Sequence, residues 1–391
     1  MSKVEKPNRE NILTKLIMGI PLRLGEKYFC RQEYFMRRKY EDFHDGAQDG
    51  LTPLEPLDLG AVEDFDGLLR AMGKTAFGGR TLGEAADVLE AMVRDPDCAM
   101  VGTFSGAMSV AKMGLLICEM IDRGWLNIII STGALIAHGF IETLGRVHYK
   151  CPDHAADRQL FKQGYNRIFD TLDMESNLDY AEDVFRTVLE GLDHQAVWSS
   201  ASLCRELGKH LAQISDSPGV LRNAYLKGVP VFIPAFTDSE LGLDLAGYMV
   251  RRGLAAGRSL DESLGGIYLN YNPFLDLADY ARRVLQHPTL GIFTVGGGVP
   301  RNWAQQVAPY LDLLAMRLNL DLPEVRFRYG VRLCPEPAHW GGLSGCTFKE
   351  GVSLGKFVSP EDGGRYAEVL CDATIAWPLL LKGVTQRLDK G

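Results

Sequence analysis

Lys356 stands in an unusual setting for a charged residue. The segment EGVSLGKFV, residues 350–358, places it after two glycines and among apolar residues, and Glu350 is the acid just before it. Most lysines extend their ammonium group to water. The alternative is that this side chain is held out of water to react as an amine. The segment alone leaves both interpretations open.

Five other segments follow predicted apolar strands and carry small, hydroxyl or acidic residues. They are TFSGAMS (103–109), STGA (131–134), FTDSELG (236–242), VGGGVPRN (295–302) and CDAT (371–374). Small residues let phosphate oxygens reach backbone N–H groups at a helix start, whereas hydroxyls or a strand-end acid suit a ribose. Each segment also has a structural alternative, which is helix capping or tight strand–helix packing.

The glycine-rich segment is the most open of the five to a flat ligand, because consecutive glycines permit close approach of the backbone. It lacks the spacing of the dinucleotide fingerprint G-x-G-x-x-G, so alone it is weak evidence. In an open parallel sheet, however, ligands bind beyond the carboxyl ends of the strands. Five such segments at one edge of a sheet therefore predict a dinucleotide site.

The elements that must position these segments are apolar strands separated by helical stretches. The predicted strands lack hydrophobic alternation, which is typical of a parallel sheet covered on both faces. Helices are expected over 105–124, ending at Gly124, and over 133–145, and the region 151–227 is expected to be mainly helical. The predicted strands are 98–104, 126–132, 229–236, 290–298, 325–333 and 366–374. The sequence thus predicts a doubly wound α/β fold with a mainly parallel sheet and helices on both faces.

Composition narrows the class of protein. The 391 residues are 46% hydrophobic and 24% charged, with a formal charge of −8 and no long basic block, which argues against a nucleic-acid surface. The eight cysteines form no CxxC pair, so neither a metal site nor a secreted disulfide framework is expected. No signal peptide or bilayer-spanning stretch is evident, which predicts a cytoplasmic protein. We expect an N-terminal helical arm over residues 1–60 and a single catalytic α/β domain over 61–391.

Taken together, the segments resemble the deoxyhypusine synthase family. STGA, VPVFIPAFTDSELG, GIFTVGGGVPRN, EGVSLGK and CDATIAWPLL occur in family order over roughly residues 95–385. The resemblance implies a Rossmann-like NAD-binding fold and a homotetramer with active sites between subunits. It also implies oxidation of spermidine, release of diaminopropane, and transfer of the aminobutyl group through an imine on a lysine to an acceptor amine.

Carried over by position, the family's reactive lysine falls on Lys356, and Glu350 matches an acid that binds the substrate. Burial would favour the neutral amine that such a lysine needs. The resemblance assigns NAD contacts to Ser105, Gly106, Ala107, Met108, Ser109, Thr132, Gly133, Asp238, Gly297, Asp372 and Ala373.

This chain departs from the family at several positions near the amine ligand. Two adjacent acids are replaced by Ala137 and His138, and other acids by Leu343 and Leu243. A tryptophan is replaced by Leu354 and a histidine by Asn302. Nearby acids could compensate, namely Glu240, Asp244 and Glu336. The expected substrate-binding residues are accordingly Glu350, Asn302, Asp244 and Leu343.

His138 has two interpretations. It is expected to act as a proton shuttle beside the nicotinamide, because histidine titrates near neutral pH. A hydrogen-bonded structural histidine is the alternative.

The resulting hypothesis is an NAD-dependent aminobutyl transferase that acts on a polyamine. Its acceptor is either a lysine of the hypusine-bearing translation factor or a small diamine, which would give homospermidine. A non-catalytic NAD-binding subunit and an NAD-dependent amine dehydrogenase remain as alternatives.

Overall fold

The computed structural model describes residues 38–390. The chain divides into two compact units, Met1–Pro53 and Leu54–Gly391. Most of the expected N-terminal arm lies outside the described residues. The described part of the first unit holds one short 3-10 helix, Tyr40–Asp42. Within the described residues, no helix is both long and apolar enough to cross a bilayer.

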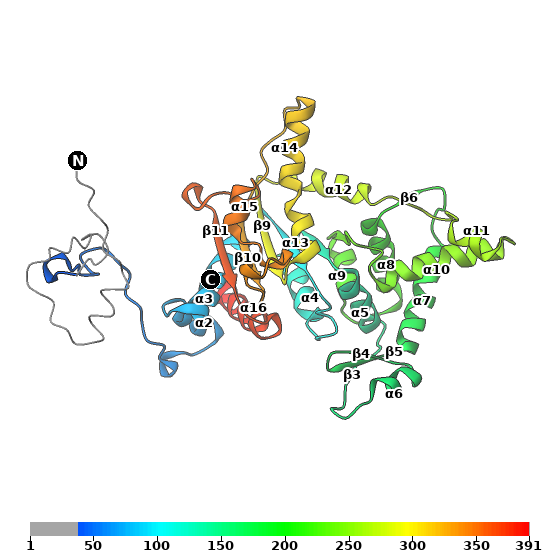
Figure 1. Ribbon diagram of the computed structural model, residues 1–391, viewed down its shortest axis with the longest axis horizontal. Helices are drawn as coiled ribbons and strands as arrows, with labels where there is room; N and C mark the ends of the chain where they lie inside the picture. The colour runs from blue at the N-terminus through cyan, green and yellow to red at the C-terminus, as the bar shows by residue number, and fades with distance from the viewer. Residues whose placement is uncertain (1–37, 391) are drawn as a thin grey trace, which may run out of the picture. The chain divides into compact units, whose positions relative to one another are not determined.

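The second unit is built on a six-stranded sheet of order β11-β10-β9-β1-β2-β7 in which every neighbouring pair is parallel (Figure 1). The α/β prediction is confirmed, and each of its strands lies within one predicted region or within one residue of it. The strands are β1 (Cys98–Phe104), β2 (Ile128–Ser131), β7 (Val231–Phe232), β9 (Thr289–Val295), β10 (Phe327–Leu333) and β11 (Arg365–Val369). Two smaller sheets join β3 (Tyr149–Lys150), β5 (Thr171–Met174) and β4 (Tyr165–Ile168), and β6 (Val197–Trp198) with β8 (Asn270–Tyr271).

Helices cover both faces of the large sheet, which explains why its strands are apolar without alternation. The helices are α2 (Phe65–Gly73), α3 (Phe77–Arg94), α4 (Gly114–Asp122), α5 (Gly133–Thr143), α6 (Asp157–Lys162), α7 (Glu175–Glu190), α8 (Ser200–Ile214), α9 (Val220–Lys227), α10 (Glu240–Ala255), α11 (Leu260–Leu264), α12 (Phe274–Val284), α13 (Gly298–Gln305), α14 (Val307–Leu318), α15 (Phe348–Ser353) and α16 (Ala373–Lys390). Short 3-10 helices lie at Leu59–Ala61, Ala338–Trp340, Leu343–Gly345 and Pro360–Asp362.

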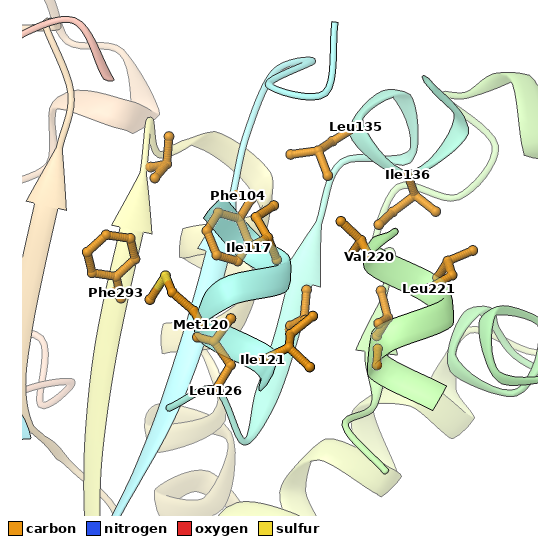
Figure 2. Packing of buried hydrophobic residues seen from close by; sticks show 14 of the residues in the cluster. Phe104, Ile117, Met120, Ile121, Leu126, Leu135, Ile136, Val220, Leu221 and Phe293 are labelled. Atoms are coloured by element: carbon orange, nitrogen blue, oxygen red, sulfur yellow. The ribbon is translucent and has the colours of Figure 1, made fainter. Parts of the chain in front are cut away.

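The two faces of the sheet carry separate cores. On one face, Phe104 and Phe293 pack against helices that include α4, α5 and α9, as Figure 2 shows. On the other face, Val101 and Ile292 pack against α12, α13, α14 and α15. Each large apolar side chain that is fully buried in these cores contributes about 1.5–3 kcal/mol. This division matters for the site, because residues on the two faces belong to different surroundings.

The helix predicted over 105–124 is wrong in its first half. Residues 108–112 form turns, and α4 begins only at Gly114. Gly106 and Lys112 have φ values of 70° and 63°, which an α-helix does not accommodate. The predicted end is correct, because Gly124 has φ 72° and donates its N–H to the Ile121 carbonyl.

The antiparallel sheet β3-β5-β4 was not predicted, because the region 151–227 was expected to be mainly helical. Its strands have only two to four residues and mix charged with apolar side chains. The two-residue turn between β4 and β5 is Phe169–Asp170, and Phe169 has φ 55°. Such turns usually contain glycine or asparagine, so this one carries no sequence signal.

Candidate active site

The loops after the parallel strands meet at one edge of the sheet. After β1, Ser105 donates its hydroxyl to the Gly297 carbonyl, which follows β9. After β2, Thr132 donates its hydroxyl to the Gly106 carbonyl at 2.6 Å. The structure therefore brings together three of the five segments that the sequence predicted to share an edge.

Two glycines at this edge are required by close packing. A Cβ atom on Gly133 would lie 2.2 Å from Ser239 Cβ, in the loop after β7. A Cβ on Gly297 would lie 2.6 Å from Ser344 Cα, in the segment after β10. These glycines let the loops of four strands touch in two pairs, so they have a structural role whether or not a ligand approaches them.

Two helices that start at this edge have no side-chain cap. The N-cap residues of α5 and α13, Thr132 and Gly297, accept no hydrogen bond from the first turn. Because the Thr132 hydroxyl bonds to Gly106 instead, the first N–H groups of α5 are free of side-chain partners. Free N–H groups at a helix start suit phosphate oxygens, and the dinucleotide site at this edge stays a prediction.

The other predicted cofactor residues have local structural partners. Ser109 is buried and donates its hydroxyl to the Leu135 carbonyl at 2.7 Å. Asp372 accepts from the Thr374 N–H and hydroxyl at the start of α16, where Ala373 is buried. Asp238 is exposed in the turn before α10.

Two predicted cofactor residues remain, and both lie in the segment between β1 and α4. Met108 is half-buried against the core, and Ala107 is also half-buried. For all these residues the cofactor role stays a prediction.

Lys356 is held out of water. Only 6% of the residue is exposed, and the neighbouring Phe357 belongs to the core shared by α12 to α15. The Phe327 N–H donates to the Lys356 carbonyl at 3.0 Å, which anchors the backbone beside the start of β10. Its Nζ donates to the neutral amide oxygen of Asn302 at 3.3 Å. Of the two environments that the sequence left open, the structure shows the buried one.

The surroundings of Lys356 disfavour its charged form. Burial lowers the pKa of the ammonium and is the largest cause; Cys346 opposes it, and the positive charge of Arg301 adds a smaller lowering. Arg301 is itself buried, donates to the Cys346 carbonyl at 2.6 Å, and has a pKa lowered by burial to about 10. A neutral amine is the reactive form of lysine, so these surroundings favour a nucleophile.

Helix α13 connects Lys356 to the edge where the loops meet. Gly298 opens the helix at that edge, and Asn302 follows four residues later. Four residues advance an α-helix by about 6 Å. Asn302 therefore holds the Lys356 amine about one helical turn from the candidate cofactor site.

Glu350 and Lys356 both feel Cys346 and Arg301, but the hydrogen bonds of Glu350 are made at the start of α15. Glu350 is exposed and closes a capping box at the start of α15, where its Oε2 accepts from Thr347 N–H at 2.6 Å and from the Thr347 hydroxyl at 2.9 Å. These hydrogen bonds from Thr347 lower the pKa of Glu350. Leu343 is 49% exposed. Their expected roles in substrate binding stay predictions.

A second group of candidate residues surrounds a cavity of about 610 Å³ between α5, α7 and α10. Ala137 and Leu243 line it, which are two of the positions where the family's acids are replaced. Six carboxylates nevertheless line this cavity, from Glu175, Asp179, Glu182, Asp183, Glu240 and Asp244, against the two arginines Arg186 and Arg251.

The two arginines of the cavity are already paired with α7. Arg186 lies 3.0 Å from Glu182 and also pairs with Asp183, and Arg251 lies 3.2 Å from Glu182. Glu240 and Asp244, which stand one turn apart on α10, receive none of these arginine contacts. The excess of negative charge suits a ligand with ammonium groups. The sequence singled out Glu240 and Asp244, but the acids of α7 were missed because they lie in an ordinary charged helix.

The surroundings of Asp244 disfavour its charged form. Burial, and then the charges of Glu182 and Glu240, raise its pKa to about 7 from the usual 3.8. The folded chain thus retains this proton at pH values where the unfolded chain has released it. The contribution of Asp244 to the free energy of unfolding accordingly falls as pH rises from about 4 through 7.

Replacing Asp244 with asparagine should remove that loss. Without amine, we expect the difference in melting temperature, variant minus native chain, to increase as pH rises from about 5 to 8. Thermal melts over this pH series measure it. Parallel curves for the two proteins would show that the carboxyl is not perturbed.

His138 lies behind this second group and touches it through Glu240. It is buried on α5, with Nδ1 3.2 Å from Asp173 Oδ2 and Nε2 3.8 Å from Glu240 Oε1. Helix α5, which carries His138, packs with α10 into the core that contains Phe104. Phe357, the residue after Lys356, belongs to the core on the opposite face of the sheet. In a single chain, the predicted site residues therefore form two groups rather than one.

Comparisons of the whole chain agree with the resemblance. A family model described as deoxyhypusine synthase matches residues 67–384. A Methanosarcina mazei protein named "Probable deoxyhypusine synthase 2" is 32% identical over 340 residues, which is 86% of this chain and 90% of that protein. An Archaeoglobus fulgidus protein of the same name is 30% identical, covering 80% of this chain and 95% of its own length.

Two further matches extend the comparison. A "Deoxyhypusine synthase-like protein" of Chlorobaculum tepidum is 28% identical over 315 residues, covering 80% of this chain and 84% of that protein. The crystal structure of a deoxyhypusine synthase candidate from Entamoeba histolytica aligns with a TM-score of 0.53 at 13% identity, covering 85% of this chain and 97% of that one. The structural match supports the fold alone.

Proposed function

This chain belongs to the deoxyhypusine synthase family, and from that premise we propose that it transfers the aminobutyl group of spermidine through an imine on Lys356. NAD is the proposed cofactor. The observation that carries the proposal is the buried Lys356 amine, whose pKa is lowered by burial and by Arg301. Asn302, which accepts from this amine, lies about one turn along α13 from the edge where the strand-end loops meet.

The proposed roles follow the geometry. Bound NAD would supply the hydride exchange that makes the amine carbon electrophilic and later reduces the product. Thr132 and the free N–H groups at the starts of α5 and α13 would hold its polar groups. Asn302 orients the Lys356 amine, which attacks the oxidised carbon, expels the diamine as leaving group and forms the new C=N bond.

The acidic cavity is the proposed binding site for the ammonium groups of the substrate. Glu240 and Asp244 offer carboxylates that the arginines leave free, and they replace the lost acids at Ala137 and Leu243. A charged carboxylate–ammonium contact is among the stronger hydrogen bonds in proteins. Asn302 would contact the same ligand beside Lys356.

A homo-oligomer with sites between subunits is part of the proposal. Lys356 and the acidic cavity belong to opposite faces of one sheet, so we propose that one ligand meets Lys356 of one copy and the cavity of another. The family's homotetramer is one assembly of this kind. If the two copies are related by a two-fold axis, each pair would form two such sites.

The acceptor is proposed to be a small diamine or a lysine of the hypusine-bearing translation factor. The non-catalytic subunit is the less favoured reading, because a chain without imine chemistry has no need for a buried lysine with a lowered pKa. A plain amine dehydrogenase would accumulate NADH, whereas the transferase recycles its hydride.

Incubation of the chain with NAD and a panel of polyamines, followed by product masses, tests the function. We expect diaminopropane and a longer amine, without net NADH. Adding the translation factor as acceptor separates the protein-modifying version from the diamine version. Net NADH would favour a dehydrogenase, and NAD binding without turnover of any amine would favour a non-catalytic subunit.

A further inference from the structure

Asp173 lies at the centre of a buried polar cluster beside the acidic cavity. The side chain of Asp173 is fully buried. Its Oδ1 accepts from the Asn177 amide at 2.8 Å and from the Met174 N–H at 2.9 Å. Its Oδ2 faces His138 Nδ1 at 3.2 Å and His148 Nε2 at 3.4 Å. Burial raises the pKa of Asp173, but the neighbouring His138, His148 and Asn177 outweigh it and hold the pKa far below its usual range. The buried carboxylate is therefore an anion at neutral pH.

Lys112 determines which nitrogen of His148 carries the proton. The Lys112 Nζ lies 2.8 Å from His148 Nδ1 and also pairs with Glu142. An ammonium group can only donate, so His148 Nδ1 accepts and the proton sits on Nε2. This nitrogen lies 3.4 Å from Asp173 Oδ2 but makes no hydrogen bond within the described residues. Ligand atoms of His138, His148 and Asp173 lie within 4.8 Å of one another, and a metal ion could bind there only after the proton on His148 Nε2 had left.

The same carboxylate orients His138. Asp173 can only accept, so His138 donates its Nδ1–H, and the lone pair of the neutral ring is left on Nε2. That nitrogen lies 3.8 Å from Glu240 Oε1, and Glu240 lines the acidic cavity. Within residues 38–390, Glu240 Oε2 is buried without a hydrogen-bond partner. His138 itself is not among the residues that line the cavity, so Glu240 is the group that connects its Nε2 to the ligand space.

We propose that His138 is the proton acceptor for the amine ligand of this cavity and that Asp173 is its positioning residue. The inference rests on the proposed function. The ligand is a secondary or primary ammonium ion whose charge is shared by Glu240. In the step, one ammonium N–H bond breaks, an Nε2–H bond forms on His138, and the lone pair returns to the amine nitrogen. The neutral amine can then lose hydride or attack an imine, and the imidazolium returns its proton to the amine product.

A purely structural cluster would predict different behaviour. In that case Asp173 would only tie β5 and the segment before β3 to α5, and its removal would lower stability without changing the chemistry. The groups that face His138 are Asp173, His148 and Glu240, and the cavity beyond them adds Asp244 and Glu182. A pH profile must be read against these groups.

The decisive variants are His138→Gln and Asp173→Asn, assayed for kcat and KM over pH 5 to 9. For His138→Gln we expect kcat to fall by about 10²- to 10⁴-fold. For Asp173→Asn we expect the acid limb of the kcat profile to move to lower pH by about one to three units, because imidazolium loses its stabilising anion. The KM for the amine should change little in that variant.

The matched control is Asp276→Asn. Asp276 is an equally buried carboxylate that accepts from Ser200 N–H, the Ser200 hydroxyl and Ala201 N–H at the start of α8. This variant should melt at lower temperature and keep the native pH profile. A profile of Asp173→Asn that superimposes on the native one, or a His138→Gln variant with native kcat, would overturn the proposal.

A second measurement keeps the proposal testable if Asp173→Asn fails to fold or if no amine is turned over. In the native chain, ¹⁵N NMR of the histidine rings should show the Nδ1–H tautomer for His138, and its titration should shift when putrescine is added. An Nε2–H tautomer of His138, or a titration of His138 that putrescine leaves unchanged, would refute its role as proton acceptor. Absent turnover with both signatures present would instead count against the proposed function alone.

Discussion

Replacing Lys356 with alanine should abolish amine turnover while NAD binding persists. We expect a loss of roughly 10³- to 10⁶-fold in kcat, as for other enzymes that lose a nucleophile. The physical reason is that the chemistry passes through a covalent bond to this amine, which burial and Arg301 keep in reach of its neutral form. Steady-state rates and NAD titration by fluorescence measure the two effects separately.

Lys356→Arg is the matched control for this prediction. The guanidinium keeps the positive charge and the donor to Asn302, but it stays protonated and forms no imine. It should be as inactive as the alanine variant. In the native chain, borohydride added during turnover should trap the substrate carbon chain on the peptide that contains Lys356. Turnover by either variant, or trapping on another lysine, contradicts the mechanism.

Removing two carboxylates from the acidic cavity should have the next largest effect. The double variant Glu240→Gln/Asp244→Asn preserves size but replaces two carboxyl groups, which an ammonium ligand would hold as carboxylates, by neutral amides. Hydrogen bonds to charged groups contribute about 1.5–3 kcal/mol each, so we expect KM for the amine to rise about 10²- to 10⁴-fold. Amine titration by calorimetry and the dependence of rate on amine concentration measure it.

The matched control removes two carboxylates elsewhere. Asp312 and Glu324 pair with Arg326, and Glu324 is largely exposed. The double variant Asp312→Asn/Glu324→Gln should keep the native KM. An unchanged KM in the cavity variant would mean that the amine binds elsewhere.

Mixing the two variants at an amine concentration near the native KM, where neither variant alone turns over, tests whether the two groups act across subunits. Lys356→Ala keeps the cavity, and the Glu240→Gln/Asp244→Asn variant keeps the lysine. If copies exchange freely and each site is shared by two of them, a 1:1 mixture recovers about a quarter of the native activity. A mixture as inactive as its components would place both groups in one subunit's site.

Much of the fold was predictable because a buried parallel strand has a plain signal. CAMVGTF is apolar throughout, and β1 has the same bounds as the prediction. The strand-end loops could be placed on one edge for the same reason, since parallel strands share their carboxyl ends. The hairpin of β4 and β5 and the turns before α4 could not be predicted, because Phe169 and Lys112 adopt positive φ although neither is glycine. Tertiary contacts impose such conformations, and local sequence does not announce them.

The site divides along the same line. The sequence was enough to identify the residue types: a lysine among apolar neighbours, glycines and hydroxyls after strands, and leucines where the family resemblance leads us to expect acids. The tertiary structure decided what each of them meets. Burial and Arg301 act on Lys356 through space, and Glu240, Asp244 and the acids of α7 converge from separate helices. Asp173 could not be assigned to His138 from spacing, because the two residues are 35 positions apart and meet only when β5 packs beside α5. Electrostatic and hydrogen-bonding energies depend on distance and burial, and both are properties of the folded chain.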